Sequence, residues 1–291
     1  METMLRDAAI SFPMLGGLTI DPPASFTLFG HQFYFYGLII AVGFLLAILY
    51  CSRTAPRFGL TADNLYDMVL WALPIGIVGA RLYFVAFQWN DYKDNLLDIF
   101  KIWNGGLAIY GGILAGAVTA VIWARRKKIP FGAMLDLGCF GLLIGQTVGR
   151  WGNFMNREAF GGVTDVFCRM GLTPPGQETI YVHPTFLYES VWNLVGFLLL
   201  SSFAKRRRQY DGQVFLLYAL WYGLGRVWIE GLRTDSLYIA GTTLRASQVL
   251  AGVSVLASAA LLLYFRNRPH KPLYASHPAP PESEPTPPRG E

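Results

Sequence analysis

Three arginines in this 291-residue chain, Arg81, Arg150 and Arg226, lie inside or at the end of long apolar stretches. A charged side chain in hydrocarbon costs at least about 2.5–3.5 kcal/mol on insertion scales, so each arginine requires a partner or a function. A guanidinium group is a permanent cation whose planar fork can hold a phosphate through two hydrogen bonds. We therefore predict that these residues recognise a phosphate diester. The plainer alternative is that each arginine extends to the membrane surface or pairs with one nearby carboxylate.

A polar stripe is expected around the last of these arginines. Tyr222, Arg226, Glu230 and Arg233 are spaced by 4, 4 and 3 residues, which places them on one face of a helix. Two interpretations stay open. Glu230 either neutralises Arg226 as a purely structural pair, or orients the guanidinium of Arg226 toward a ligand.

The segment GRWGNFMNREAFGG at 149–162 combines polar side chains with glycines close to the end of an apolar stretch. Glycine allows a backbone to approach a ligand closely and to adopt positive φ angles. A simple re-entrant turn would explain the glycines, but not two asparagines and an acid at the same depth. Its candidate polar residues are Arg150, Asn153, Asn156, Arg157 and Glu158.

Two further positions could take part in chemistry. Tyr110, in NGGLAIYGG at 104–112, is expected about two turns into a helix, between glycines that leave space around its hydroxyl group. The alternative is an aromatic side chain of the membrane interface. His183 precedes Pro184 at the start of another expected helix, where proline suits the first turn. His183 is equally a helix-opening residue or a catalytic one.

The elements that must position these residues are membrane helices. Hydrophobic residues make up 53% of the chain and charged residues 15%, against about 25% in soluble domains, and the mean hydropathy is +0.35. We predict an all-α, polytopic integral membrane protein of the cell (cytoplasmic) membrane with about seven transmembrane helices, each of about 20 residues. The expected spans are 34–52, 65–89, 105–124, 133–150, 184–204, 212–230 and 245–265.

The basic residues predict the orientation. Alternate connectors and the tail hold 14 of the 24 lysines and arginines, and the opposite connectors hold seven. By the positive-inside rule, the N-terminus faces out and the C-terminus faces in. In this arrangement Arg81, Arg150 and Arg226 all lie in the outer half of the membrane, with Arg150 ending its helix. Because topology accounts for the basic clusters, the net charge of +5 does not indicate a nucleic-acid partner.

The chain divides into three expected parts. Residues 1–33 form an extracytoplasmic N-terminal segment, 34–265 a seven-helix transmembrane catalytic domain, and 266–291 a proline-rich disordered cytoplasmic tail. The three cysteines and four histidines are scattered without metal-ligand spacing, so we expect neither a metal site nor a cofactor.

Together these motifs resemble the bacterial prolipoprotein diacylglyceryl transferase family. The resemblance runs from Phe35-Tyr36-Gly37 to Arg233, about two thirds of the chain. Its most specific element is GRWGNFMNRE at 149–158, because an arginine at a helix end followed by a Gly-Asn pair rarely arises from packing alone. The other elements are Gly-Ala-Arg81, GGLAIYGG, HPTFLYE from His183, and YGLGRVWIEGLR at 222–233.

The resemblance implies an activity and its partners. Members transfer the sn-1,2-diacylglyceryl group of phosphatidylglycerol to the lipobox cysteine thiol in the signal peptide of a preprolipoprotein. This forms a thioether and releases glycerol-1-phosphate. It implies catalytic roles for Arg226, Tyr110, Glu158 and Glu230. The implied substrate-binding residues are Arg150, Asn153, Gly161, Tyr36, Arg81 and Tyr222.

One position departs from the family. Many members carry histidine where this chain has Tyr110, and that histidine has been assigned as the base that takes the thiol proton. Tyrosine, with an ordinary pKa near 10, is a poor base at pH 7, although its hydroxyl can hydrogen-bond a phosphate or thiol. Either the base lies elsewhere in this chain, or the role was never simple deprotonation.

Two other classes of function are alternatives to an enzyme. A transporter of an anionic solute or lipid would also place arginines inside a bundle, but inverted repeats and broken helices near the midplane are expected of it, and the sequence shows neither. A non-catalytic membrane scaffold would not require three arginines in the outer leaflet. Lipid-to-peptide transfer by the purified protein separates the enzyme from both.

Overall fold

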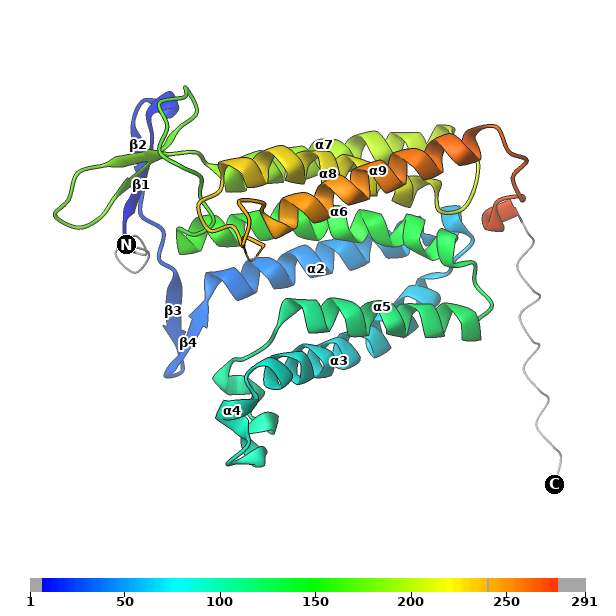
Figure 1. Cartoon of the computed structure of the whole chain (residues 1–291), viewed down its shortest axis with the longest axis horizontal. Helices are drawn as coiled ribbons and strands as arrows, with labels where there is room; N and C mark the ends of the chain where they lie inside the picture. Colours follow the sequence, from blue (N-terminus) through cyan, green and yellow to red (C-terminus); the bar gives the residue numbers. More distant parts are fainter. Residues whose placement is uncertain (1–6, 240, 277–291) are drawn as a thin grey trace. The chain divides into compact units, whose positions relative to one another are not determined.

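The computed structural model describes residues 7–239 and 241–276 (Figure 1). The chain forms two compact units. Unit 1 contains Met1–Cys51 and Gly138–His270, and unit 2 contains Ser52–Leu137 and Lys271–Glu291. Most of the expected tail, 277–291, lies outside the described residues, as do residues 1–6 of the N-terminal segment.

Within residues 7–239 and 241–276, seven helices of 18 or more residues correspond one to one with the predicted spans. Five are long and apolar enough to cross a membrane, namely α2 with its extension to Phe58, α3, α6, α7 and α9, which confirms a multi-pass membrane protein. The other two are less apolar, because α5 ends in two arginines and α8 carries an arginine and a glutamate.

The bounds of the seven long helices are α2 Phe35–Thr54, α3 Ala62–Phe87, α5 Ile109–Arg126, α6 Phe131–Asn156, α7 Thr185–Arg206, α8 Gln213–Leu232 and α9 Ala246–Arg266. Shorter helical segments are η1 Pro13–Leu15, η2 Ala55–Phe58, α4 Trp89–Tyr92, η3 Leu96–Phe100, η4 Ile102–Asn104 and η5 Tyr274–Ser276.

The prediction of an all-α chain was wrong outside these helices. Unit 1 contains an antiparallel four-stranded sheet in the order β2-β1-β5-β6 and a separate hairpin of β3 and β4. The sheet pairs segments far apart in sequence, for example Ile10 with Leu172, which no local pattern shows. The strands are β1 Ala9–Phe12, β2 Leu18–Ile20, β3 Ser25–Leu28, β4 His31–Tyr34, β5 Met170–Thr173 and β6 Ile180–Val182.

The sheet is fastened to the helices by a buried apolar cluster. Ile10 of β1 and Leu172 of β5 pack with Phe154 of α6 and Phe186 of α7, and the two phenylalanine rings lie 4.9 Å apart. The sheet therefore covers one end of the helices of unit 1, which we call the sheet end (Figure 1). This end includes the last turns of α6 and α8 and the first turns of α7.

A reciprocal tryptophan contact fixes α7 against α8. The indole N–H of Trp192 donates to the carbonyl of Trp221, and the indole of Trp221 donates to the carbonyl of Trp192, both at 3.0 Å. Their rings stack with centroids 4.4 Å apart. A Cβ atom on Gly196 would collide with the Trp221 indole, and one on Gly225 would collide with the Trp192 indole. Both glycines are therefore required for this close approach.

In unit 2 the tightest helix pair is α3 with α5. A Cβ atom on Gly111 would collide with the carbonyl oxygen of Gly79 and with Tyr83, and one on Gly79 would collide with Ala115. Small residues thus allow the two backbones to touch, as is common between helices in membranes.

The tryptophan contact generates a stability prediction. Gly225→Ala should destabilise the protein by about 1–3 kcal/mol, because the new methyl group overlaps the Trp192 indole in a packed interface. Gly252→Ala in α9 is the matched control, since its methyl group meets no neighbouring atom within 4 Å, and it should be neutral or slightly stabilising. Thermal unfolding in detergent compares the two, and equal midpoints would contradict this role of Gly225.

Candidate functional site

A buried glutamate joins three helices at the sheet end of unit 1. Glu189, in the second turn of α7, is 4% exposed. Its Oε2 accepts from Nη2 of Arg150 on α6 at 2.5 Å, and its Oε1 accepts from Nη1 of Arg226 on α8 at 2.9 Å. Each carboxylate oxygen therefore holds one guanidinium group, and two of the three predicted arginines meet at the same depth.

Glu230 completes the environment of Arg226. Its Oε2 lies 2.7 Å from Nη2 of Arg226, one helical turn away, and the carboxylate is buried. The expected pair along α8 therefore exists, but it is not a self-contained one, because Arg226 also binds Glu189. Glu230 orients a guanidinium that links two helices.

A third arginine borders this cluster from the end of α8. Arg233 Nη1 lies 3.7 Å from Glu189, while Arg233 Nε and Nη2 donate to the two carboxylate oxygens of Asp235 at 2.8 and 2.6 Å. The hydrogen bond from Arg233 lowers the pKa of Asp235. Three cations and three anions thus balance in the cluster, as burial requires. They are Arg150, Arg226, Arg233, Glu189, Glu230 and Asp235.

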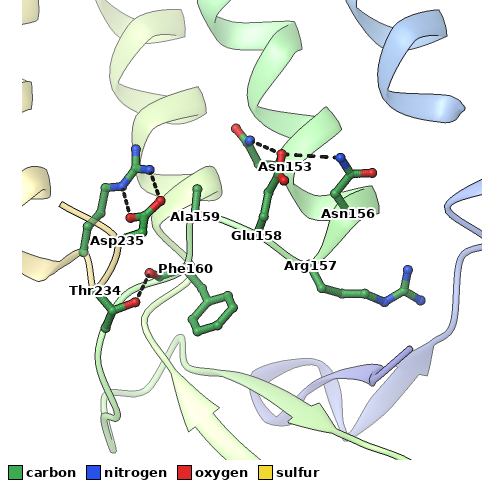
Figure 2. Close-up of a pocket in the computed structure, with 9 residues that line it drawn as sticks. Asn153, Asn156, Arg157, Glu158, Ala159, Phe160, Thr234 and Asp235 are labelled. Atoms are coloured by element: carbon green, nitrogen blue, oxygen red, sulfur yellow. Dashed lines mark hydrogen bonds and ion pairs between the residues drawn. The ribbon is translucent and has the colours of Figure 1, made fainter. Parts of the chain in front are cut away.

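The signature segment extends this network toward solvent. Arg150 Nη1 donates to Oδ1 of Asn153 at 3.3 Å, and Nδ2 of Asn153 donates to Glu158 Oε1 at 2.8 Å. Asn156 Nδ2 donates to the same oxygen at 3.4 Å (Figure 2). The prediction that the helix ends at Arg150 was wrong, because α6 continues to Asn156. Arg150 is therefore held on a rigid helix rather than at a fraying end.

A polar pocket of about 290 Å³ opens beside this network (Figure 2). It combines amide, carboxylate, hydroxyl and guanidinium groups from the end of α6, the segment that follows it, and the turn after α8. Its lining residues are Asn153, Asn156, Arg157, Glu158, Ala159, Phe160, Arg233, Thr234 and Asp235.

Arg157 has a structural task at the edge of that pocket. Its guanidinium donates to the carbonyls of Ala8 and Met155, each at 2.9 Å, and to the carboxylate of Asp21 at 2.7 Å. In Figure 2 its side chain extends away from Thr234 and Asp235. Arg157 therefore ties the N-terminal strands to the end of α6.

Two glycines allow predicted site residues to lie close together. The Gly161 N–H donates to the carbonyl of His183 at 2.9 Å, and a Cβ atom at 161 would lie 2.7 Å from His183 Cβ. A Cβ atom on Gly152 would lie 2.7 Å from the ring of Tyr36, the second residue of α2. Any larger side chain at 161 or 152 would separate these segments.

Tyr222 lines a small cavity at the ion-pair cluster. The volume, about 10 Å³, is room for about one water molecule. Buried Asn193 also lines it, and its Oδ1 has no hydrogen-bond partner among the described residues. The cavity is lined by Glu189, Trp192, Asn193, Tyr222, Gly225, Arg226 and Ile229.

Arg81 belongs to unit 2, where it is 5% exposed. Its guanidinium donates to four backbone carbonyls and lies over the Tyr92 ring at 5.1 Å. It therefore fixes the segment that leads into α5, and its predicted contact with substrate stays a prediction. The carbonyls are those of Asp98, Ile99, Gly105 and Gly106, at 2.7 to 2.9 Å.

Tyr110 is the second residue of α5 rather than two turns into it, and it is 55% exposed. The expectation that the adjacent glycines leave space around its hydroxyl stays a prediction, and the structure gives these glycines a packing role. Gly111 packs directly on the backbone of Gly79 in α3. The glycines serve helix packing, and Tyr110 projects from the start of α5.

His183 lies in a separate polar group. Its Nδ1 is 3.3 Å from the hydroxyl of Tyr188, which is 3.2 Å from Cys168 Sγ. Both interpretations of His183 stay open, and its carbonyl contributes to the site by pairing with Gly161.

Comparison with known proteins identifies the family. A family model described as prolipoprotein diacylglyceryl transferase matches residues 23–264. The chain belongs to this family. The phosphatidylglycerol–prolipoprotein diacylglyceryl transferase of Enterococcus faecalis is 44% identical over 258 residues, 86% of this chain and 92% of the relative. That of Geobacillus kaustophilus is 45% identical over 273 residues, covering 91% and 96%.

The structure of this transferase brings together most of the residues expected from the sequence. In unit 1, Arg150, Arg226, Glu230, Asn153 and Glu158 form one connected network. Gly161 pairs with Arg233, Tyr222 lines a cavity with Glu189 and Arg226, and the Tyr36 ring packs on Gly152. Arg81 and Tyr110 belong to unit 2. No group of three or more His, Cys, Asp or Glu side chains in the described part of the chain could hold a metal ion.

Glu189 is the member that sequence reasoning missed. It is the last residue of HPTFLYE and an acid inside the predicted span 184–204, but it was not among the predicted site residues. The cost argument that selected the arginines applies equally to a buried carboxylate. Applied to both signs of charge, it marks Glu189 as a residue that requires a partner.

Glu189→Gln should destabilise the transferase by up to about 3–5 kcal/mol, because it leaves Arg150 without a carboxylate partner and Arg226 with Glu230 alone. It should also lower activity by misplacing both arginines. Glu178→Gln, which changes an exposed acid between β5 and β6, should affect neither. Thermal unfolding in detergent and activity at matched concentration measure the effects. If Glu189→Gln unfolds at the temperature of Glu178→Gln, the carboxylate does not hold the cluster together.

Proposed function

We propose that this chain transfers the sn-1,2-diacylglyceryl group of phosphatidylglycerol to the lipobox cysteine thiol of preprolipoproteins in the cell membrane. Seven transmembrane helices, with the N-terminus outside and the C-terminus inside, place the sheet end in the outer half of the membrane. The observation that carries the proposal is the convergence of Arg150 and Arg226 from separate helices on one buried carboxylate. The names of the related transferases state both substrates, phosphatidylglycerol and prolipoprotein.

The reaction is an alkyl transfer. The thiolate of the lipobox cysteine attacks the glyceryl carbon, a C–S bond forms, and the C–O bond to phosphate breaks. Glycerol-1-phosphate leaves with the electron pair, and the thiol proton passes to solvent. Guanidinium groups that bind the phosphate more tightly as its negative charge grows lower the barrier.

The described contacts of Arg150 and Arg226 suit this task. Each guanidinium carries five N–H donors, and carboxylates or amides fix its orientation through Nη1 and Nη2. A phosphate oxygen can therefore bind donors that are already aligned, without reorganisation during the reaction. Glu189 and Glu230 act as positioning residues for the two cations.

The remaining predicted residues have supporting roles in this proposal. We assign substrate contacts to the hydroxyl groups of Tyr36, whose ring packs on Gly152, and of Tyr222, which lines the cavity at the cluster. Asn153 and Glu158 border the 290 Å³ pocket, which is polar enough for a glycerol headgroup. Gly161 keeps the backbone close to His183. Arg81 secures the segment before Tyr110, and through it the start of α5.

No strong base is required for thiol activation. A thiol with an ordinary pKa near 8.5 is a few per cent ionised at pH 7, and nearby guanidinium groups increase that fraction. The family assignment favours this transferase activity over transport of an anionic lipid, the alternative for an arginine-lined bundle.

The direct experiment uses purified full-length protein in detergent micelles with phosphatidylglycerol and a synthetic lipobox peptide. Mass spectrometry should show the peptide heavier by one diacylglyceryl group, with stoichiometric glycerol-1-phosphate. A peptide whose lipobox cysteine is serine should stay unmodified. Absence of the heavier peptide with folded protein would overturn the proposed function.

Arg150→Ala should abolish transfer with membrane insertion intact. Loss of a charged hydrogen-bond partner costs about 1.5–3 kcal/mol, and more when the contact tightens in the transition state. Arg150→Lys should also be poor, because an ammonium group cannot reproduce the planar fork. Arg266→Ala, an exposed cation at the far end of α9, is the control. Near-normal turnover of Arg150→Ala at matched abundance would remove this residue from the site.

Tyr110→Phe distinguishes a hydrogen-bonding hydroxyl from a general base. We expect a loss of about two- to twelve-fold in rate, corresponding to one hydrogen bond of about 0.5–1.5 kcal/mol. Tyr110→His should be tolerated, because position 110 is exposed at the start of α5. Rates are measured against pH at saturating lipid. A loss of about 10²-fold or more, with histidine restoring the rate, would identify position 110 as the base.

A further inference from the structure

The hairpin of β3 and β4 has two chemically different faces. Its register pairs Phe26 with Phe33 and Leu28 with His31 on one face. Ser25, Thr27, Gln32 and Tyr34 lie on the other, where Gln32 Nε2 donates to Ser25 Oγ at 2.8 Å. The Phe26 and Phe33 rings stack at 5.6 Å. The ribbon is thus amphipathic, with an aromatic face and a polar face.

Nothing in the described part of the chain buries the aromatic face. Phe26, Leu28 and Phe33 are all exposed, and Phe29 at the tip is 91% exposed. Phe29 and Gly30 both have positive φ angles, 50° and 78°. Asparagine or glycine is the usual first residue of such a turn. An aromatic side chain in this conformation adds strain without packing inside the chain, which indicates a contact outside it.

The chemistry of the segment favours lipid over another protein or water. Residues 22–36 contain no lysine, arginine, aspartate or glutamate. By contrast, the turn between β5 and β6 carries Glu178 at an exposed position. Aromatic side chains with an adjacent polar face are typical of the membrane interface.

The hairpin is also continuous with a membrane-spanning helix. The N–H of Phe35, the first residue of α2, donates to the carbonyl of Ala24 at 3.0 Å, and the Phe26 and Phe35 rings lie 5.2 Å apart. From there α2 exposes apolar side chains such as Leu38 and Leu45. In Figure 1 the hairpin runs across the direction of α2, as a ribbon lying along a membrane surface would.

We propose that residues 25–34 form an interfacial membrane anchor whose aromatic face and Phe29 tip insert into the lipid surface at the sheet end. The aromatic face contacts the headgroup and upper acyl region of the bilayer. The polar face remains toward the headgroups and water. The anchor adds a lateral lipid contact to the bundle and requires only that α2 crosses the membrane, so it does not depend on the proposed transfer reaction.

A spin label at the tip tests this anchor. Phe29→Cys is made in a Cys168→Ser background of the full chain, because Cys51 and Cys139 are buried, and is labelled with a nitroxide. The protein is reconstituted in vesicles of phosphatidylglycerol and phosphatidylethanolamine. Collision rates with oxygen, which concentrates in lipid, and with a water-soluble nickel chelate then report the depth of the label. Glu178→Cys, in the same background, is the matched control at an exposed turn of the four-stranded sheet.

At position 29 we expect collisions with oxygen to exceed those with the nickel chelate several-fold, and the reverse at 178. A water-like ratio at 29 would overturn the proposal. An immobilised label protected from both reagents would also overturn it, since that outcome means that protein covers the tip. Phe29→Asp should shift a label at position 28, on the aromatic face, toward water, whereas Phe29→Leu should leave it unchanged. Equal ratios for these two variants would likewise contradict insertion.

Discussion

A carboxylate and a guanidinium buried among apolar helices must each find an opposite charge, and Glu189 meets this requirement for three helices at once. Its two oxygens hold Arg150 of α6 and Arg226 of α8. Removing Glu189 would leave Arg150 without a carboxylate, so the positions of α6, α7 and α8 at the sheet end depend on this one side chain. Because three acids neutralise the three arginines, these permanent cations are stable in a low-polarity environment. In our proposal they bind a phosphate there.

The rest of unit 1 keeps this cluster in register. The reciprocal contact of Trp192 with Trp221 lies three residues from Glu189 and five from Arg226, so the helix pair cannot slide without breaking two indole hydrogen bonds. At the sheet end, Phe154 and Phe186 anchor the four-stranded sheet, and Arg157 ties the N-terminal strands to α6. Rigid helices, rather than loops, therefore carry the charges that we assign to phosphate recognition.

In our proposal, the same end of unit 1 holds the elements that meet the lipid headgroups and the peptide substrate. The polar pocket beside Asn153 and Glu158 continues the network from the ion pairs toward solvent. The aromatic hairpin before α2 gives the bundle a contact with the lipid surface that supplies the donor. A reaction between a membrane lipid and a peptide thiol requires both environments within reach of one site.

The sequence alone determined the properties that depend on local periodicity and composition. Seven apolar stretches marked the seven long helices, and the spacing of Tyr222, Arg226 and Glu230 predicted a stripe on one helix. The GRWGNFMNRE signature identified the family that the comparison confirmed. Tertiary structure decided what depends on distant partners. Glu189 lies 37 residues before Arg226 along the chain, Ile10 pairs with Leu172 across the sheet, and Gly111 serves a contact with α3 rather than Tyr110. Long-range pairing leaves no periodic trace in a single sequence, because its energy comes from groups that meet only after the helices have packed.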